Sequence, residues 1–173
     1  VHNDGGNVAA VAQKLGAARP QAVLMFIAGP PVAQLMLSLA ETGVSASYYG
    51  MSVVAGEAVA QAMGDRLRGL AIAQVVPHPW SELDPTTRHY RALATKAQVP
   101  VGYQSFEGYL NALVLIEGLR RCGRTPTRSA LHEAMRGLRT RVAGVDIDYS
   151  GGQHTGSRFV ELVHVNAQGR FIR

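Results

Sequence analysis

Apolar and polar residues follow two different periods along the first part of the chain. Within residues 7–17, Val8, Ala12 and Leu15 recur at helical spacing, which predicts a helix with one apolar face. The following residues, QAVLMFIA (21–28), form a continuous apolar run of strand length. Such a run predicts a strand that is covered on both faces, as in a parallel sheet.

The same order of elements then recurs. Pro30 and Pro31 suit the first turn of a second helix, because that turn leaves backbone amides unpaired in any case. VSASYYG (44–50) predicts a second strand, residues 57–63 predict a short helix, and GLAIAQVV (69–76) predicts a third strand. Strands that alternate with helices indicate a three-layer α/β fold with a parallel sheet.

A proline-containing segment, PHPWSELDP (77–85), separates this part from a helical one, because its prolines exclude a central strand. We interpret it as a crossing between two lobes. Asp84 or Thr86 starts the first helix beyond it, and Ser105 starts a longer one. The longer helix carries an apolar stripe that we expect to be buried. Its members are Phe106, Tyr109, Leu110, Leu113, Ile116 and Leu119.

The chain ends in strands. Thr125-Pro126 or Thr127 is placed to start a third helix. Beyond it, apolar and polar residues alternate over 145–149 and predict a strand with Asp146 on its solvent side. Residues 157–165 and 170–173 are predicted to pair across a tight turn.

Composition narrows the classes of function. The chain has 173 residues, 47% of them hydrophobic, which is enough for a sizeable core. No apolar stretch approaches the ~18 residues of a membrane span. The net charge of +5 comes mainly from arginines, but no aromatic residues are interleaved with them for base stacking, so we expect no nucleic-acid binding. The single cysteine, Cys122, excludes an internal disulfide.

Motifs for cofactors and metals are missing from the sequence. The six histidines form no H-x-x-x-H pair, and neither a GxGxxG nor a Walker sequence occurs. We therefore expect no metal ion and no cofactor. The segment Gly50-Met51-Ser52 resembles the start of a nucleophile elbow, with Val54 in place of its second glycine. A serine hydrolase that uses Ser52 is the alternative that this segment leaves open.

Two strand ends run directly into predicted helix starts, at residues 28–31 and 50–52. Open α/β sheets bind ligands at such ends, because unpaired amides and the helix dipole point into the crevice. Ordinary turns are the alternative interpretation.

Several segments, in their order, resemble the second half of a type I periplasmic solute-binding protein, of the branched-chain amino-acid-binding family of ABC importers. The segments are VAQKLGAARPQAVLMFIAG, ETGV, YYGMS, GLAIAQVVPHP, FEGYLNALVLIEGLRRCG, TPTRSALHEAM and GSRFVELVHVNAQGRF. The resemblance implies two Rossmann-like lobes that trap a solute by hinge closure, without catalysis. Residues 1–76 and 141–173 then belong to the second lobe and 77–140 to the helical part of the first, both incomplete relative to the family.

The resemblance also implies partners and a location. It implies a mature protein in the periplasm, which delivers its solute to the membrane permease of an ABC transporter. A cytoplasmic ligand-sensing domain of the same fold is a further alternative. Since much of the first lobe has no counterpart here, we expect the apolar helix stripes to be uncovered and the fragment to self-associate.

The resemblance and the residue chemistry together suggest a solute. Ser52 stands where amino-acid-binding members carry an acidic residue for the ammonium group, which disfavours an α-amino acid. We expect a small carboxylate with an apolar or aromatic body, with its anion held by backbone amides. The expected solute-binding residues are Ala28, Gly29, Pro30, Tyr49, Met51, Ser52 and Tyr103.

Overall fold

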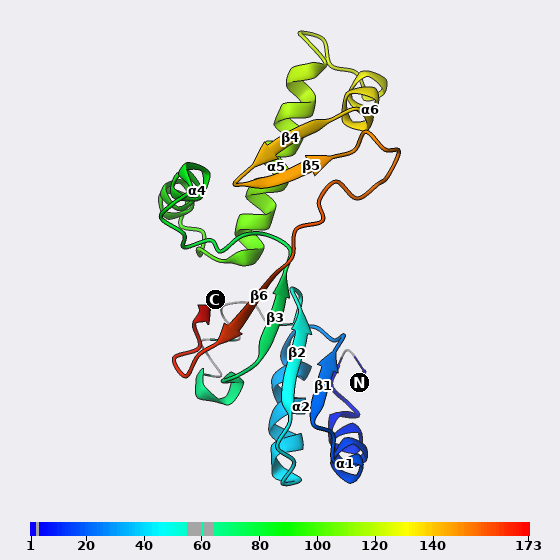
Figure 1. The fold of residues 1–173 in the computed structure, drawn as a ribbon, viewed down its shortest axis with the longest axis vertical. Helices are drawn as coiled ribbons and strands as arrows, with labels where there is room; N and C mark the ends of the chain where they lie inside the picture. The colour runs from blue at the N-terminus through cyan, green and yellow to red at the C-terminus, as the bar shows by residue number, and fades with distance from the viewer. Residues whose placement is uncertain (3, 55–59, 61–63) are drawn as a thin grey trace. The chain divides into compact units, whose positions relative to one another are not determined.

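The computed structural model describes residues 1–2, 4–54, 60 and 64–173, which form two compact units. Unit 1 comprises Val1–Gln74 and Glu161–Arg173, and unit 2 comprises Val75–Val160. Figure 1 shows the order of the elements along the chain. The helix predicted at 57–63 lies almost entirely outside the described residues.

Unit 1 is built on a five-stranded sheet in the order β1-β2-β3-β6-β7. The strands are β1 (Ala22–Met25), β2 (Ser47–Met51), β3 (Ala71–Gln74), β6 (Glu161–Val165) and β7 (Phe171–Ile172). The pairs β1–β2 and β2–β3 are parallel, whereas β6 joins β3, and β7 joins β6, in the antiparallel direction. The predicted α/β class and the pairing of the last two strands are therefore confirmed.

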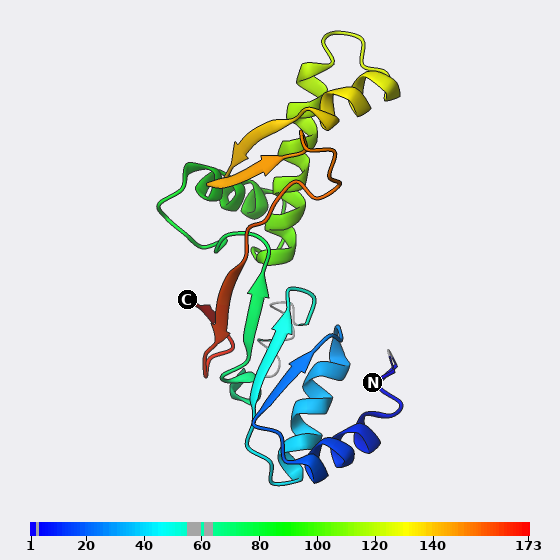
Figure 2. The same ribbon diagram turned by 45° about the vertical axis from the view of Figure 1, so that its right-hand side comes forward.

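Two helices of unit 1, α1 (Val8–Ala18) and α2 (Pro30–Glu41), pack against each other. Figure 2 shows both on the same side of β1 and β2. Pro30 and Pro31 occupy the first helical positions of α2, as predicted. A short 3-10 helix, η1 (Gly64–Leu67), precedes β3.

The core of unit 1 lies on one face of its sheet. Val23, Met25, Ile72, Val163 and Val165 are all buried and point to this face. On the opposite face, Leu24 is 61% exposed, and Phe26, just beyond β1, is 71% exposed. The prediction that the run 21–28 is covered on both faces is therefore wrong for this chain, because a continuous apolar run does not reveal which elements are available to cover it.

Unit 2 contains three helices among its described elements, α4 (Pro85–Lys96), α5 (Tyr103–Arg121) and α6 (Arg128–Arg136). The predicted caps of α4 and α6 are confirmed: Asp84 accepts a hydrogen bond from the Thr87 amide at 3.0 Å, and Thr127 accepts one from the Ala130 amide at 3.1 Å. The predicted start of α5 is two residues late. Ser105 lies inside the helix, where its hydroxyl donates to the Pro100 carbonyl at 2.7 Å.

The buried side of α5 differs from the predicted stripe. Phe106 and Leu110 are buried as expected, whereas Ile116 and Leu119 are exposed. The helix turns Val114 and Gly118 inward instead, because α6 packs at Gly118. A methyl group at Gly118 would lie 2.5 Å from the Met135 sulfur, so alanine at this position would require the flexible Met135 side chain to shift. None of the described helices has the length and apolarity to cross a membrane.

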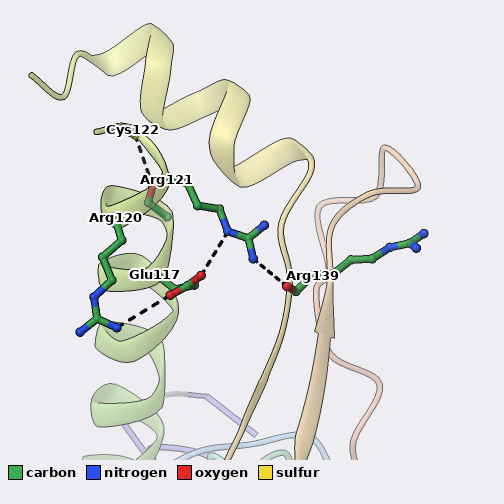
Figure 3. Close-up of polar contacts among 6 residues, drawn as sticks. Glu117, Arg120, Arg121, Cys122 and Arg139 are labelled. Carbon is green, nitrogen blue, oxygen red and sulfur yellow. Dashed lines mark hydrogen bonds and ion pairs between the residues drawn. The ribbon is translucent and has the colours of Figure 1, made fainter. Parts of the chain in front are cut away.

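The two strands that follow α6, β4 (Arg139–Val142) and β5 (Val145–Asp148), form an antiparallel hairpin that belongs to unit 2. Arg121, on α5, is paired with Glu117 and donates to the Arg139 carbonyl at 2.8 Å (Figure 3). The boundary between the two compact units falls between residues 160 and 161, because this hairpin is bonded to the helices, and the lobe boundary at 141 stays a prediction. The other boundary, between residues 74 and 75, lies close to the one expected at 76.

Candidate functional site

The parallel pairing of β1 and β2 brings their carboxyl ends together. Met25 is the register partner of Gly50, so the residues that follow each strand leave the sheet side by side. These are Ala28, Gly29 and Pro30 after β1, and Ser52 after β2. Two separate parts of the sequence thus meet at the carboxyl end of one sheet, which is where open α/β sheets bind ligands.

The first of these turns has a backbone conformation that requires glycine. Gly29 precedes α2 with φ 72° and ψ −152°, a combination that is open almost only to glycine. Pro30 and Pro31 come next and carry no amide hydrogens. The Val32 amide donates back to the Gly29 carbonyl at 3.2 Å. The donors that this turn can offer to an anion are therefore the amides of Ala28 and Gly29, fewer than an ordinary helix N-terminus provides.

The second turn holds Ser52 in a partly buried position. A 2.9 Å hydrogen bond from the Val54 amide to the Met51 carbonyl closes this turn. Val54 is fully buried, which anchors the end of the turn in the core. Tyr49 and Met51 are exposed on the face of the sheet that faces away from that core. The side chains of Tyr49 and Met51 are thus accessible to a solute.

Tyr103 belongs to the other unit. It is the first residue of α5, is 3% exposed, and packs edge-on against Trp80, with ring centroids 5.9 Å apart. The His78 ring lies 6.1 Å from the Tyr103 ring in the same cluster. Sequence reasoning missed these neighbours of Tyr103, because residues more than twenty positions apart share no local pattern.

Charge is absent from the side chains at the two strand ends. Ala28, Gly29, Pro30, Met51 and Ser52 offer one hydroxyl and no ionisable group. The neighbouring Tyr48 hydroxyl is neutral at physiological pH, as tyrosine ordinarily is, and burial raises its pKa further. A charged solute would therefore meet backbone dipoles and one hydroxyl at these strand ends.

The histidine on the same sheet is poorly placed to activate Ser52. His164 on β6 is the register partner of Ala71 on β3, and Ala71 is the register partner of Tyr49 on β2. His164 therefore lies two strands away from Tyr49, and Tyr49 precedes Ser52 by three residues. This register separates His164 from Ser52 by roughly 10 Å across the sheet and by a similar distance along the strands. Ser52 also lacks the positive φ of a strained turn. The arrangement gives no support to the hydrolase interpretation.

Two carboxylates of unit 2 are held in ion pairs. Asp146 and Asp148 are exposed on the β4–β5 hairpin, where they pair with Arg141 and Arg139. This arrangement confirms the solvent side predicted for Asp146. In the described part of the chain, no group of three or more histidine, cysteine or acidic residues is placed to hold a metal ion.

Comparison with known proteins identifies the family to which this fold belongs. A family model described as "Periplasmic binding protein" matches residues 1–170. The chain belongs to the periplasmic binding protein family. A comparison with curated protein sequences finds no match.

Solved periplasmic binding proteins share the fold. A substrate-binding periplasmic protein from Ralstonia solanacearum is 31% identical, with a TM-score of 0.84, over 96% of this chain and 49% of its own. An extracellular ligand-binding receptor from Verminephrobacter eiseniae is 25% identical, with a TM-score of 0.83, over 98% and 49%. A branched-chain amino acid ABC transporter protein from Thermus thermophilus, solved with bound valine, is 20% identical, with a TM-score of 0.83, over 96% and 48%, and shows the fold alone.

This chain spans about half the length of these periplasmic binding proteins. The family assignment thus confirms the resemblance on which the sequence interpretation relied.

Proposed function

We propose that this chain is part of the solute-binding component of an ABC importer, located in the periplasm, with a membrane permease as its partner. The observation that carries the proposal is the meeting of two uncharged turns at the carboxyl end of the unit 1 sheet, in a chain of the periplasmic binding protein family. Unit 1 would form part of the second lobe and unit 2 part of the first. Solute recognition would involve no bond making or breaking.

The solute that we propose is a small carboxylate with an apolar or aromatic body. An ammonium group enclosed in a binding cleft needs a charged or strongly polar partner, because leaving it unpaired costs several kcal/mol, roughly. The strand ends of unit 1 supply no such charge. The backbone amides of Ala28 and Gly29 and the hydroxyl of Ser52 are hydrogen-bond donors suited to a carboxylate.

The exposed ring of Tyr49 and the thioether side chain of Met51, at the end of β2, suit the body of that solute. Tyr49 and Met51 are each 42% exposed and lie on one face of the strand. Aromatic and thioether side chains provide apolar contact that adapts to different shapes. Tyr103 remains a predicted contact, for which the ring would have to emerge from its present contacts with Trp80 and His78.

A thermal-shift panel with matched solutes tests the proposal. Leucine and 4-methylpentanoate differ only by the amino group, as do phenylalanine and 3-phenylpropanoate. We expect the two carboxylates without an amine to raise the melting temperature, since a ligand at 100 times its Kd adds about 2.7 kcal/mol of stability. A shift with leucine or phenylalanine alone would contradict the proposal and would place the partner of the ammonium group outside these strand ends.

The transport role has a separate test in the gene. A secretory signal encoded upstream, together with neighbouring permease genes, is the expected result. A helix-turn-helix or kinase segment on the same polypeptide would instead support a cytoplasmic sensor and would contradict the importer.

A further inference from the structure

Unit 2 contains a surface pocket between α6 and the loop that follows β5 (Figure 1). Its volume of about 440 Å³ lies within the range of roughly 300–1,000 Å³ that is usual for small-molecule sites. We call it the basic pocket and define it by six of the side chains that line it. These are His132, Met135, Arg136, Tyr149, Gln153 and His154. All six belong to unit 2, and none of them takes part in the function proposed above.

Backbone hydrogen bonds join the two walls of the basic pocket. His132, Met135 and Arg136 form one wall, because their spacing of i, i+3 and i+4 places them on one face of α6. The other wall is the loop that starts at Tyr149. The Tyr149 amide donates to the carbonyl of Leu138, just beyond α6, at 2.9 Å, and Leu138 is fully buried. The loop and the helix are therefore held in one arrangement.

The loop itself is closed at its base. The Asp148 amide donates to the Gly156 carbonyl at 2.8 Å. A methyl group at Gly156 would lie 2.4 Å from Cζ of Tyr149, so the Tyr149 ring rests directly against the backbone at this glycine. The ring is thereby fixed in the lining of the basic pocket. Together with the Met135 thioether, it gives the pocket an apolar part.

The polar side chains of the basic pocket are hydrogen-bond donors. Arg136 has five N–H groups and no acceptor, and an imidazole keeps at least one N–H in either charge state. Gln153 is oriented by Arg158, which donates to its Oε1 at 3.3 Å. Since the carbonyl of Gln153 is occupied in this way, its NH₂ group is left to donate to a ligand. Among the described residues that line the basic pocket, none is acidic.

The carboxylates of this region lie outside the basic pocket. Asp146 and Asp148 line a neighbouring pocket, with which the basic pocket shares only Gln153. Glu133 does not line the basic pocket, although its Oε1 is 3.8 Å from Nδ1 of His132. Nε2 of His132 takes no part in that pair. The combination of one guanidinium, two imidazoles and one amide, without a carboxylate, is complementary to an anion.

We propose that the basic pocket binds a phosphate monoester with an apolar body. The three terminal oxygens of such a phosphate accept hydrogen bonds from several directions, which matches donors that come from both α6 and the loop. The pocket is many times larger than the roughly 30 Å³ of a water molecule, so a bare inorganic anion would fill little of it. Met135 and Tyr149 provide apolar contact for the body of the ligand. The proposal does not depend on the solute proposed for unit 1.

Calorimetric titration of the purified protein with phenyl phosphate tests the proposal. Inorganic phosphate, which lacks the apolar body, and benzoate, which replaces the phosphate by a carboxylate, are titrated in parallel. We expect phenyl phosphate to bind at a single site. Its affinity should exceed those of inorganic phosphate and benzoate by roughly tenfold each, because each comparison removes either the buried ring or a charged hydrogen-bond acceptor.

Matched variants test whether the basic pocket is responsible. Arg136→Gln should weaken the binding of phenyl phosphate by roughly tenfold or more, since it removes charge-assisted hydrogen bonds. Gln153→Glu places a carboxylate in the pocket and should abolish binding. The control Arg124→Gln removes the same charge from an exposed residue that does not line the pocket, and it should leave the affinity unchanged. Circular dichroism verifies folding, and His154→Gln replaces any variant that does not fold.

Four outcomes would overturn the proposal. The first is that phenyl phosphate does not bind at millimolar concentration, and the second is that Arg136→Gln and Arg124→Gln bind it equally well. The third is that inorganic phosphate or benzoate binds as tightly as phenyl phosphate, which would deny the pocket its preference for a phosphate with an apolar body. The fourth is stoichiometric binding of Zn²⁺ that requires His132 and His154 and prevents the binding of phenyl phosphate, which would make the two histidines metal ligands instead.

Discussion

Gly50 and Val54 lie so close together that only glycine fits at the end of β2. A methyl group at residue 50 would be 2.5 Å from Val54 Cγ2, and Val54 is fully buried. The turn between these two residues contains Ser52. The contact therefore couples the packing of the unit 1 core to the position of a predicted solute-binding residue.

Gly50→Ala should lower the free energy of unfolding by about 2 kcal/mol, because overpacking forces neighbouring atoms to shift. Chemical denaturation measures this loss. In Gly50→Ala combined with Val54→Ala, the smaller side chain removes the clash, so the two losses should not add. Gly108→Ala, at an open position on α5, is the matched control and should stabilise by roughly 0.5–1 kcal/mol. Additive losses at 50 and 54 would contradict the contact.

Gly29→Ala should destabilise for a different reason. The space around the new methyl group is open, but the backbone at φ 72° and ψ −152° is unfavourable for any residue with a Cβ. The expected loss is roughly 1–3 kcal/mol, and the melting temperature measures it. Because the turn would also move, the carboxylate-induced thermal shift should shrink. A variant of unchanged stability would show that the turn has no need of glycine.

Pro30→Ala separates solute binding from stability. The substitution restores an amide donor at the first position of α2, beside the proposed carboxylate. The protein without solute should become slightly less stable, by roughly 0.4–1 kcal/mol, since proline restricts the unfolded chain. The affinity for 4-methylpentanoate should rise, as measured by calorimetric titration. Weaker binding would indicate that the solute does not approach this helix.

The surroundings of Asp148 predict that the stability of the β4–β5 hairpin depends on pH. Hydrogen bonds from the Ser150 hydroxyl and amide, followed by the charge of Arg139, hold the pKa of Asp148 below its ordinary value. Because the folded pKa is lower than the unfolded one, the hairpin is stabilised above the unfolded pKa. This stabilisation is lost as the pH falls through the folded pKa. Ser150→Ala should raise the pKa of Asp148 in a carbon NMR titration, whereas Ser129→Ala should leave it unchanged.

Asp84→Ala should destabilise α4 by about 1 kcal/mol, the usual cost of removing an N-cap. The Asp84 carboxylate accepts from the amide of Thr87, which is almost fully buried, so water replaces this bond poorly. Asp84→Asn keeps an oxygen acceptor and should retain most of the stability. Equal losses in the two variants, measured by denaturation, would assign the effect to charge instead of capping.

Local chemistry made much of the fold predictable. Asp84 and Thr127 start helices because their side chains bond to amides three residues ahead, and Pro30 starts one because it needs no amide partner. The start of α5 was less predictable. Gly102 precedes the helix without a side-chain cap, while the more suggestive Ser105 donates its hydroxyl to a carbonyl upstream.

The candidate site was predictable only in part. Apolar runs that end in Gly-Pro or Gly-Met-Ser identified the two strand ends, because a strand followed directly by a helix leaves a recognisable turn. That the two ends lie side by side depends on the pairing of Met25 with Gly50, a contact between distant residues. The cluster of Tyr103 with Trp80 likewise joins residues with no common local pattern.

By itself, the sequence determined the α/β class, most of the helix starts and the uncharged character of the turns at Ala28 and Ser52, since each depends on neighbouring residues. Only the tertiary structure decided which side of each element is buried. Leu24 and Ile116 are as apolar as their buried neighbours, yet both are exposed. Burial depends on which other elements are present to pack against a face, and apolar periodicity carries no information about those elements.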